Sequence, residues 1–290
     1  MCGIAGIWGR VSERRLRRMT SRLSHRGPDD ERWWIRGMGV RSNDRSNAGT
    51  AGQSTLGENE HDQRMAEQPT IGFGHRRLAI IDCDGGRQPM SSGGSTVCFN
   101  GAIYNFEELR EAHASRGFAF RTRSDTETIL SSYELSGGDA GFIRELRGMY
   151  AFALWDEHRQ RLWLARDPVG KKPLFYTVCS GEFLFASEIA ALISALDQAP
   201  SVSSRAIRDY LGWGCIPGPG TIYEGVYTLR PGEILLLEQG SIVHRELVTP
   251  WNDADGSVNF ESEEEIVAAL RESVRIRMRA DVPVGAFLSG

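Results

Sequence analysis

No segment of the 290-residue sequence is apolar over the length that a membrane-spanning helix needs, and the mean hydropathy is −0.34. An excess of basic residues is also missing, because 34 lysines and arginines stand against 38 acidic residues and the net charge is −4. No basic and apolar leader opens the sequence. We therefore expect a globular chain with neither a nucleic acid nor a membrane among its partners.

Cysteines that could pair or bind a metal are scarce as well. The sequence has five cysteines, an odd number, at positions 2, 83, 98, 179 and 215. None belongs to a CxxC pair, and no histidines stand at zinc-finger spacing. We therefore expect no disulfide framework and no metal site, and we expect a reducing cytoplasm as the compartment.

The sequence does contain a cysteine at position two, directly before the small, apolar, strand-like segment 3–8. If Met1 is removed, as is usual before a small residue, Cys2 carries a free α-amine beside its thiol. A thiol has an ordinary pKa of about 8.5 and an α-amine one of about 7.7 to 8.0, so the amine can accept the thiol proton near neutral pH. Cys2 is thus a candidate nucleophile that needs no catalytic histidine. The alternative is a cysteine that is simply buried.

The segment after this strand predicts a helix over 12–24, with Ser12 as its N-cap and five arginines on one face. An anionic partner or a solvated face would explain the arginines, and the acidic balance of the chain favours the solvated face. His25 follows in a Gly-Pro-Asp turn, where a turn-fixing hydrogen bond is favoured over a catalytic role. The polar stretch 41–68 is typical of a mobile surface insertion, with a lid as the alternative.

Two arginines stand in the middle of a predicted strand or strand pair at 70–82. Strand alternation places Arg76 and Arg77 on opposite faces. An arginine held on a rigid strand can grip a carboxylate through two hydrogen bonds. A surface ion pair is the alternative explanation.

A further predicted strand begins at residue 97 and ends at Asn100-Gly101, and Asn105 stands where the next helix needs a cap. An Asn-Gly pair commonly just makes a turn. Beside a thiol nucleophile, the asparagine amide and the glycine N–H can instead stabilise the oxyanion of a tetrahedral intermediate.

Another helix begins after Ser124, its predicted N-cap, and carries Asp125 in its first turn. An acid at this place is favoured by the helix dipole whatever its function. A substrate ammonium would be the functional reason for Asp125 to face inward.

Hairpin patterns run from residue 148 to residue 186, between helical segments. Apolar strands with helices on both sides predict an α+β fold built as a layered sandwich. Towards the end, residues 263–279 predict a helix, followed by a buried strand over 281–290. The apolar residues at core spacing in this helix are Ile266, Leu270, Val274 and Met278.

Taken together, these motifs resemble those of the glutamine-dependent asparagine synthetases, in order and rough spacing, over nearly the whole chain apart from the polar insertion. The segments concerned are 1–6, 25–30, 75–82, 100–101, 124–127, 144–156 and 166–176. The resemblance implies a four-layer αββα N-terminal-nucleophile sandwich at 1–250, followed by a linker at 251–262. Residues 263–290 would be the first helix and strand of a truncated α/β ATP-pyrophosphatase-type synthetase domain.

By the same resemblance, Cys2 is the glutaminase nucleophile, and Asn100 with Gly101 forms the oxyanion hole. The substrate glutamine would be hydrolysed to glutamate and ammonia without a cofactor. The resemblance assigns glutamine binding to Arg77, Leu78, Asn100, Gly101 and Asp125.

One position departs from the family pattern. The family commonly has a glutamate of the amine-binding site after the Asn-Gly pair, whereas this chain has Ala102. We therefore expect a raised KM for glutamine, with the thiol still competent.

The synthetase half implied by the resemblance uses ATP and Mg²⁺ and amidates aspartate through β-aspartyl-AMP. Its nucleotide-binding loop would begin at Leu288, Ser289 and Gly290, so this chain alone is expected to act only as a glutaminase. The near alternative is a relative that amidates a different acid, in natural-product or envelope-glycan assembly. A non-catalytic binding protein on the same fold is the distant alternative, and a homodimer is left open as the assembly.

Overall fold

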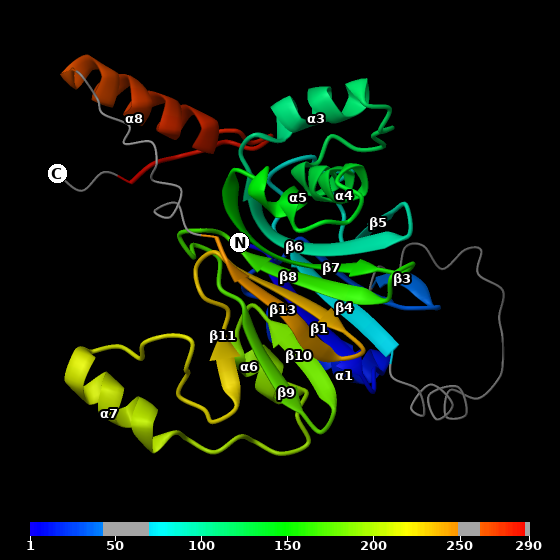
Figure 1. The fold of residues 1–290 in the computed structure, drawn as a ribbon, viewed down its shortest axis with the longest axis vertical. Helices are drawn as coiled ribbons and strands as arrows, with labels where there is room; N and C mark the ends of the chain where they lie inside the picture. The colour runs from blue at the N-terminus through cyan, green and yellow to red at the C-terminus, as the bar shows by residue number, and fades with distance from the viewer. Residues whose placement is uncertain (43–69, 249–261, 288–290) are drawn as a thin grey trace.

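The computed structural model describes residues 1–42, 70–248 and 262–287, which form two β-sheets with helices on their outer faces (Figure 1). No helix in these ranges is both long and apolar enough to cross a bilayer. Three sequence-based predictions lie outside the described residues: the insertion from residue 43 on, the linker up to residue 261, and the nucleotide loop at Leu288, Ser289 and Gly290.

The first sheet has the strand order β11-β9-β10-β1-β4-β2-β3. Its strands are β1 (Gly3–Gly9), β2 (Asp30–Ile35), β3 (Gly39–Ser42), β4 (Thr70–Arg77), β9 (Phe175–Cys179), β10 (Glu182–Ala186) and β11 (Val226–Thr228). The second sheet has the order β13-β12-β8-β7-β6-β5. Its strands are β5 (Met90–Ser92), β6 (Ser95–Ile103), β7 (Gly148–Asp156), β8 (Arg161–Arg166), β12 (Glu233–Glu238) and β13 (Ser241–Leu247). Neighbouring strands of both sheets run antiparallel in the described residues.

Helices cover the outer face of each sheet. α1 (Glu13–Ser21) and α6 (Ile189–Ser194) pack on the first sheet. α3 (Phe106–Ser115), α4 (Asp125–Leu135) and α5 (Gly141–Arg144) lie over the second sheet. In Figure 1, α7 (Ser204–Trp213) and α8 (Glu263–Arg277) stand apart from both sheets.

Three hydrophobic clusters separate these layers, one between the sheets and one between each sheet and its helices. β1 shows how a single strand serves two of them. Because successive side chains of a strand point to opposite faces, Ile4 and Trp8 enter the cluster between the sheets, whereas Ala5 and Ile7 enter the cluster under α1 and α6. The layers therefore follow the order αββα, and the predicted fold is confirmed.

Two of the three predicted helix caps are confirmed. The hydroxyl oxygens of Ser12 and Ser124 accept backbone N–H bonds from the first turns of α1 and α4. The prediction for Asn105 was wrong, because its side chain makes no cap hydrogen bond. Its Oδ1 accepts from the N–H of Arg147 and its Nδ2 donates to the carbonyl of Glu145, each at 2.9 Å. These tertiary bonds to the segment before β7 replace the local one.

The predictions for the arginines and for His25 in the segment 12–30 are largely confirmed. Four of the five arginines of the helical segment, Arg14, Arg17, Arg18 and Arg22, face solvent. Arg15 is the exception, since its guanidinium binds the carboxylate of Glu182 at 2.9 and 3.0 Å. His25 Nε2 lies 2.8 Å from Glu188 Oε1, which is the expected turn-fixing hydrogen bond.

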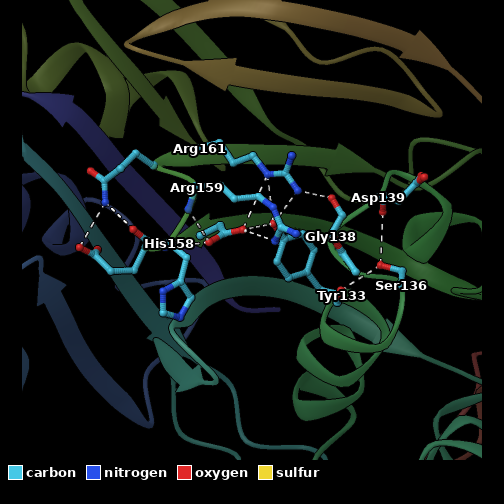
Figure 2. A network of polar contacts seen from close by, with 11 residues as sticks. Tyr133, Ser136, Gly138, Asp139, His158, Arg159 and Arg161 are labelled. Carbon is cyan, nitrogen blue, oxygen red and sulfur yellow. Dashed lines mark hydrogen bonds and ion pairs between the residues drawn. The ribbon is translucent and has the colours of Figure 1, made fainter.

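A polar network fixes the C-terminal end of α4 to the turn between β7 and β8 (Figure 2). The Tyr133 hydroxyl donates to the buried Asp156 carboxylate and accepts from Arg161 at 3.1 and 3.2 Å. Burial raises the pKa of Asp156, but the hydrogen bonds from Tyr133 and from Arg159 outweigh it and hold that pKa below its ordinary value. The network thus anchors the helix whose other end carries Asp125.

Substitution Tyr133→Phe is expected to lower the free energy of unfolding by about 1.5–3 kcal/mol, because it removes a hydrogen bond to a buried charged group. Urea denaturation followed by circular dichroism measures this change. The matched control is Tyr227→Phe, since the half-exposed Tyr227 hydroxyl makes no hydrogen bond within the described ranges. A loss of stability equal to that of the control would contradict the anchoring role.

α8 forms as predicted, but the expected core positions of this helix were wrong. The side chains of Ile266, Leu270, Val274 and Met278 are exposed to 43, 61, 57 and 56%. Ile276 is buried instead, at 4%. The apolar stripe of this helix is exposed, and no described element covers it. In Figure 1, the helix itself stands apart from both sheets. Helical spacing identifies an apolar face and not the surface that covers it.

The strand predicted over 281–290 is not formed in its described part, 281–287. Phe287 is fully exposed, and the segment pairs with neither sheet. A lone apolar segment does not persist as a strand without a neighbour to accept its hydrogen bonds. The segment contacts the sandwich through Asp281, which bonds with the loop 80–82.

Candidate active site

The residues singled out in the sequence line one cavity of about 230 Å³ at the edge between the two sheets. This volume suits a ligand of amino-acid size, since pockets for larger organic ligands measure about 300–1,000 Å³. The predicted residues that share the cavity are Cys2, Arg77, Leu78, Asn100, Gly101 and Asp125. Ala102 also lines it. They come from the ends of β1, β4, β6 and α4, so the antiparallel pairing of the strands brings distant parts of the sequence together.

Cys2 is placed by the start of β1, the central strand of its sheet. Its Sγ lies 3.4 Å from the N–H of Leu78, which donates to it, and 3.7 Å from the carbonyl of Leu78. The Cys2 carbonyl accepts from Arg26 Nε at 3.0 Å. These contacts orient the half-buried thiol towards the cavity.

Burial raises the pKa of the Cys2 thiol, although the Leu78 N–H and the N-terminal positive charge act against this. The thiol is therefore protonated near neutral pH and needs a base to become a nucleophile. The chain's own amino group is at hand, because Met1 lines the same cavity and burial lowers the pKa of its amine. The environment thus favours an uncharged amine beside an uncharged thiol.

Asn100 sits on β6 with 1% of its surface exposed, and neither of its side-chain polar atoms has a hydrogen-bond partner among the described residues. An unpartnered buried amide costs about 1–3 kcal/mol, so native proteins rarely keep one without a reason. Gly101, its neighbour, has room for no side chain, because an added Cβ would lie 2.1 Å from the Met149 carbonyl oxygen. The backbone of β6 therefore approaches β7 closely while the Asn100 amide is free to bind a ligand oxygen.

Asp125 occupies the first turn of α4 and is 5% exposed. Its Oδ2 accepts from the N–H of Ile103 at 3.0 Å, and it forms no ion pair with any described residue. Burial raises its pKa to about 6, against the lowering effect of the Ile103 and Thr126 N–H groups. A buried carboxylate without a cation is arranged to receive one from a ligand.

Arg77, at the end of β4, supplies the opposite charge. It is 5% exposed, and its guanidinium donates to the carbonyls of 81–83 at 2.6 to 3.3 Å. No carboxylate of the described residues lies within ion-pair distance of it. Gly86 links the two charges in space, because a Cβ there would lie 2.8 Å from Arg77 Nη2 and 3.0 Å from Ser124 Oγ, next to Asp125. One cation and one anion at one end of the cavity match the carboxylate and the ammonium of an amino acid.

The outer wall of the cavity was not predicted from the sequence. It is formed by Arg277, the last residue of α8, and by Arg279, Ala280 and Val284 in the segment that follows. Arg279 donates to the Tyr104 carbonyl and pairs with Glu107 and Glu108 at 3.2 and 2.8 Å. Asp281 accepts from the N–H of Asp82 at 2.7 Å. No local pattern in the sequence signals that these residues reach a pocket some 200 positions upstream.

Lys172, in the turn between β8 and β9, was also missed. It is 4% exposed and lines the cavity beside Met1 and Cys2. The sequence did not signal this burial, because lysines are rarely buried and a Lys-Lys pair in a turn is typical of a solvated surface.

Residues 54–248 match the family model of the glutamine amidotransferase domain. The chain belongs to this family. Residues 265–290 match a second family model, that of asparagine synthase, so the family resemblance stated from the motifs is confirmed. The asparagine synthase match includes Leu288, Ser289 and Gly290.

Among similar proteins, the asparagine synthetase [glutamine-hydrolyzing] 1 of Bacillus subtilis is 33% identical over 303 residues, which cover 100% of this amidotransferase chain and 42% of that protein. The asparagine synthetase [glutamine-hydrolyzing] 3 of the same bacterium is 35% identical over 305 residues, which cover 100% of this chain and 43% of that protein. The amidase chry2 of Gibberella zeae is 35% identical over 279 residues, which cover 92% of this chain and 36% of that protein. The chain thus spans less than half the length of these relatives.

Two solved structures share the fold of this amidotransferase. The glutamine phosphoribosylpyrophosphate amidotransferase of B. subtilis, complexed with ADP and GMP, aligns with a TM-score of 0.54 at 21% identity, over 85% of this chain and 49% of that one. A structure described as the allosteric regulatory enzyme of purine biosynthesis aligns with a TM-score of 0.56 at 22% identity, over 85% and 49%. These likenesses support the αββα sandwich.

Proposed function

We propose that this chain hydrolyses glutamine to glutamate and ammonia with Cys2 as the nucleophile. The observation that carries the proposal is the Asn100 side chain, buried and unpartnered among the described residues, in the cavity that also holds the Cys2 thiol. Arg77 and Asp125 supply the charges that an amino-acid substrate needs at its carboxylate and its amine. Family membership supports the same substrate.

In this mechanism, Met1 is removed and the Cys2 α-amine accepts the thiol proton. The thiolate attacks the side-chain amide carbon of glutamine, and the oxyanion binds the Asn100 amide and the Gly101 N–H. Collapse of this intermediate transfers the proton to the leaving nitrogen, breaks the C–N bond and releases ammonia. Water then hydrolyses the γ-glutamyl thioester to glutamate and restores the thiol.

Asn100→Ala is expected to lower kcat for glutamine hydrolysis by about 10²-fold, while KM changes little, because the donor acts on charge that develops in the transition state. Steady-state assay of glutamate release measures both constants. The melting temperature is not expected to fall, because the substitution removes a buried amide that has no hydrogen-bond partner among the described residues. A rise in KM with kcat preserved would assign Asn100 to substrate binding instead.

The proposed function is tested by the release of glutamate from glutamine, with intact mass used to show that Met1 is gone. The matched control is the same chain with a short N-terminal extension, which keeps the Cys2 thiol but converts its amine into an amide. We expect release from the free-Cys2 protein and none from the extended one. Equal release from both would contradict the role of the amine, and no release from either would contradict the glutaminase.

For the longer protein, we propose a domain order of glutaminase at 1–250, linker at 251–262 and synthetase domain from 263. Ammonia from Cys2 would amidate an acid, aspartate in first place, that ATP with Mg²⁺ activates as an acyl-adenylate. The names of the two Bacillus relatives and the asparagine synthase match support this order. The nucleotide residues proposed for this domain, Leu288, Ser289 and Gly290, lie outside the described ranges.

A second acceptor class is favoured by one observation: the relatives include fungal proteins named amidases, chry2 and chyE, at 35% and 39% identity. The full-length protein with glutamine, Mg-ATP and single carboxylic acids separates the two proposals. Asparagine and AMP formed from aspartate would support the first, and turnover with other acids only would support the second. A reducing cytoplasm suits both, because the reaction needs a free thiol.

A further inference from the structure

Lys172 is buried on a rigid turn that opens into the Cys2 cavity. The Asp167 carboxylate accepts the N–H groups of Val169, Lys171 and Lys172 at 2.9 to 3.1 Å and holds the turn in place. The lysine stem is therefore fixed, with its amine directed towards the start of the chain.

No carboxylate among the described residues pairs with the Lys172 ammonium. Within the described ranges, its only hydrogen-bond partner is the thioether Met1 Sδ, at 2.9 Å. A thioether is a weak acceptor, so it compensates little for the loss of water around a buried ammonium. Removal of Met1 takes even this partner away, while Lys172 lines the same cavity as Cys2, the new N-terminus. A cation kept in such a place calls for a functional reason.

We propose that Lys172 is a positioning residue whose charge keeps the α-amine of Cys2 unprotonated, so that this amine can take the thiol proton. The inference rests on the proposed glutaminase function. It follows from geometry, since Lys172 contacts residue 1 and lines the same cavity as Cys2. Two adjacent ammonium groups repel each other, and the weaker base, the α-amine, gives up its proton first.

The other charged groups around the amine leave this argument intact. With Met1 in place, burial, Arg26 and Lys172 lower the pKa of the Met1 amine, while Cys2 and Asp29 raise it. Lys172 itself is faced by Arg26, Asp167, Cys2 and Lys171. The two cations that lower the pKa of the Met1 amine thus come from separate segments, the 25–30 turn and the β8–β9 turn. Arg26 is occupied by the Cys2 carbonyl and Glu188, whereas Lys172 has no such partner in the described ranges.

The decisive experiment titrates the amine directly, in the Cys2→Ala protein with Met1 removed. The NMR shift of the ¹³C-labelled methyl group that this substitution introduces reports the protonation of the adjacent α-amine, with no need for glutaminase activity. We expect the amine to titrate about one pH unit higher in Lys172→Met than with Lys172 present, the size expected for one charge several ångströms away. Lys172→Arg should keep the lower value, and Lys171→Met, at an exposed neighbour, should not change it. Unchanged titration in Lys172→Met overturns the proposal.

The enzymatic readout is the pH profile of kcat/KM for glutamine with Cys2 present. We expect Lys172→Met to lose about tenfold at pH 7 and to converge with the unsubstituted protein above pH 9, where the amine is unprotonated in both. Lys172→Arg should restore the loss at pH 7. An equal loss at every pH would indicate structural damage and overturn the proposal. If the unsubstituted protein has no glutaminase activity, the proposed function fails, and the amine titration still decides the role of Lys172.

Discussion

Replacing Cys2 by alanine is expected to lower glutamate release by at least about 10⁴-fold, the scale seen when an enzyme loses its nucleophile. The described structure offers no substitute thiol in the cavity, since Cys98 is fully buried and Cys83, Cys179 and Cys215 are exposed elsewhere. Burial also raises the pKa of Cys98 far above its ordinary value, which keeps it an inert thiol.

The assay compares Cys2→Ala with Cys179→Ala, which removes an exposed thiol at the end of β9. Cys179→Ala should retain full activity, and thermal unfolding should show that both variants fold. Glutamine binding, measured by calorimetry, should survive in Cys2→Ala because Arg77 and Asp125 are untouched. Hydrolysis that persists in Cys2→Ala would place the nucleophile elsewhere and remove the basis of the proposed mechanism.

Asp125→Asn is expected to weaken the use of glutamine and to stabilise the fold at the same time. Loss of the charge that faces the substrate ammonium breaks a buried ion pair, which costs about 3–5 kcal/mol and lowers kcat/KM by about 10²- to 10³-fold or more. The loss should appear mainly as a higher KM, since the thiol and the Asn100 amide remain in place. Activity of the unsubstituted protein should likewise fall below about pH 6, where Asp125 becomes protonated.

The stability effect follows from the raised pKa of Asp125, about 6 against an ordinary 3.8. Between pH 3.8 and about pH 6, Asp125 binds a proton more tightly in the folded state than in the unfolded state. Its contribution to the free energy of unfolding therefore falls as pH rises through about 6. At pH 8 the full penalty is present, and Asp125→Asn should gain about 1–3 kcal/mol in free energy of unfolding. Near pH 4 the gain should disappear.

Urea denaturation at pH 4 and pH 8 measures this difference, with Asp84→Asn as the matched control on an exposed loop. Asp84→Asn should change neither stability nor KM. A destabilised Asp125→Asn protein at pH 8 would show that the carboxylate serves the fold rather than a ligand. Opposite signs for stability and affinity are the mark of a residue kept for binding.

The residues of the pocket could be predicted where their signals are local. Ser124 caps α4 as predicted, because a helix cap depends on neighbours within four positions. The strand end predicted at Asn100-Gly101 was wrong, because β6 continues to Ile103 in its pairing with β7, although Asn100 does line the pocket. Cys2 needed only its place in the chain. The pairing of β1 with β4 and of β6 with β7 then brought these ends together, which family resemblance supplied and periodicity alone could not.

The predictions that failed depend on distant partners. The side chain of Asn105 prefers the backbone of Glu145 and Arg147, forty residues away, to the local cap. The apolar stripe of α8 has the spacing of a core face, but spacing shows only that a helix has an apolar face. It does not show which part of the protein packs against that face. Lys172 was missed because burial of a lysine depends on the fold around it.

The wall built by residues 277–284 bears on how such proteins can be recombined. The glutamine amidotransferase match ends at 248, yet the cavity is closed by the segment that matches asparagine synthase. A chimera joined after residue 248 would therefore give the Cys2 pocket a foreign wall without the Arg279 contacts to Tyr104 and Glu108. A crossover placed beyond residue 284 would carry the pocket whole. The pocket of this amidotransferase domain thus depends on residues beyond the segment that its family model matches.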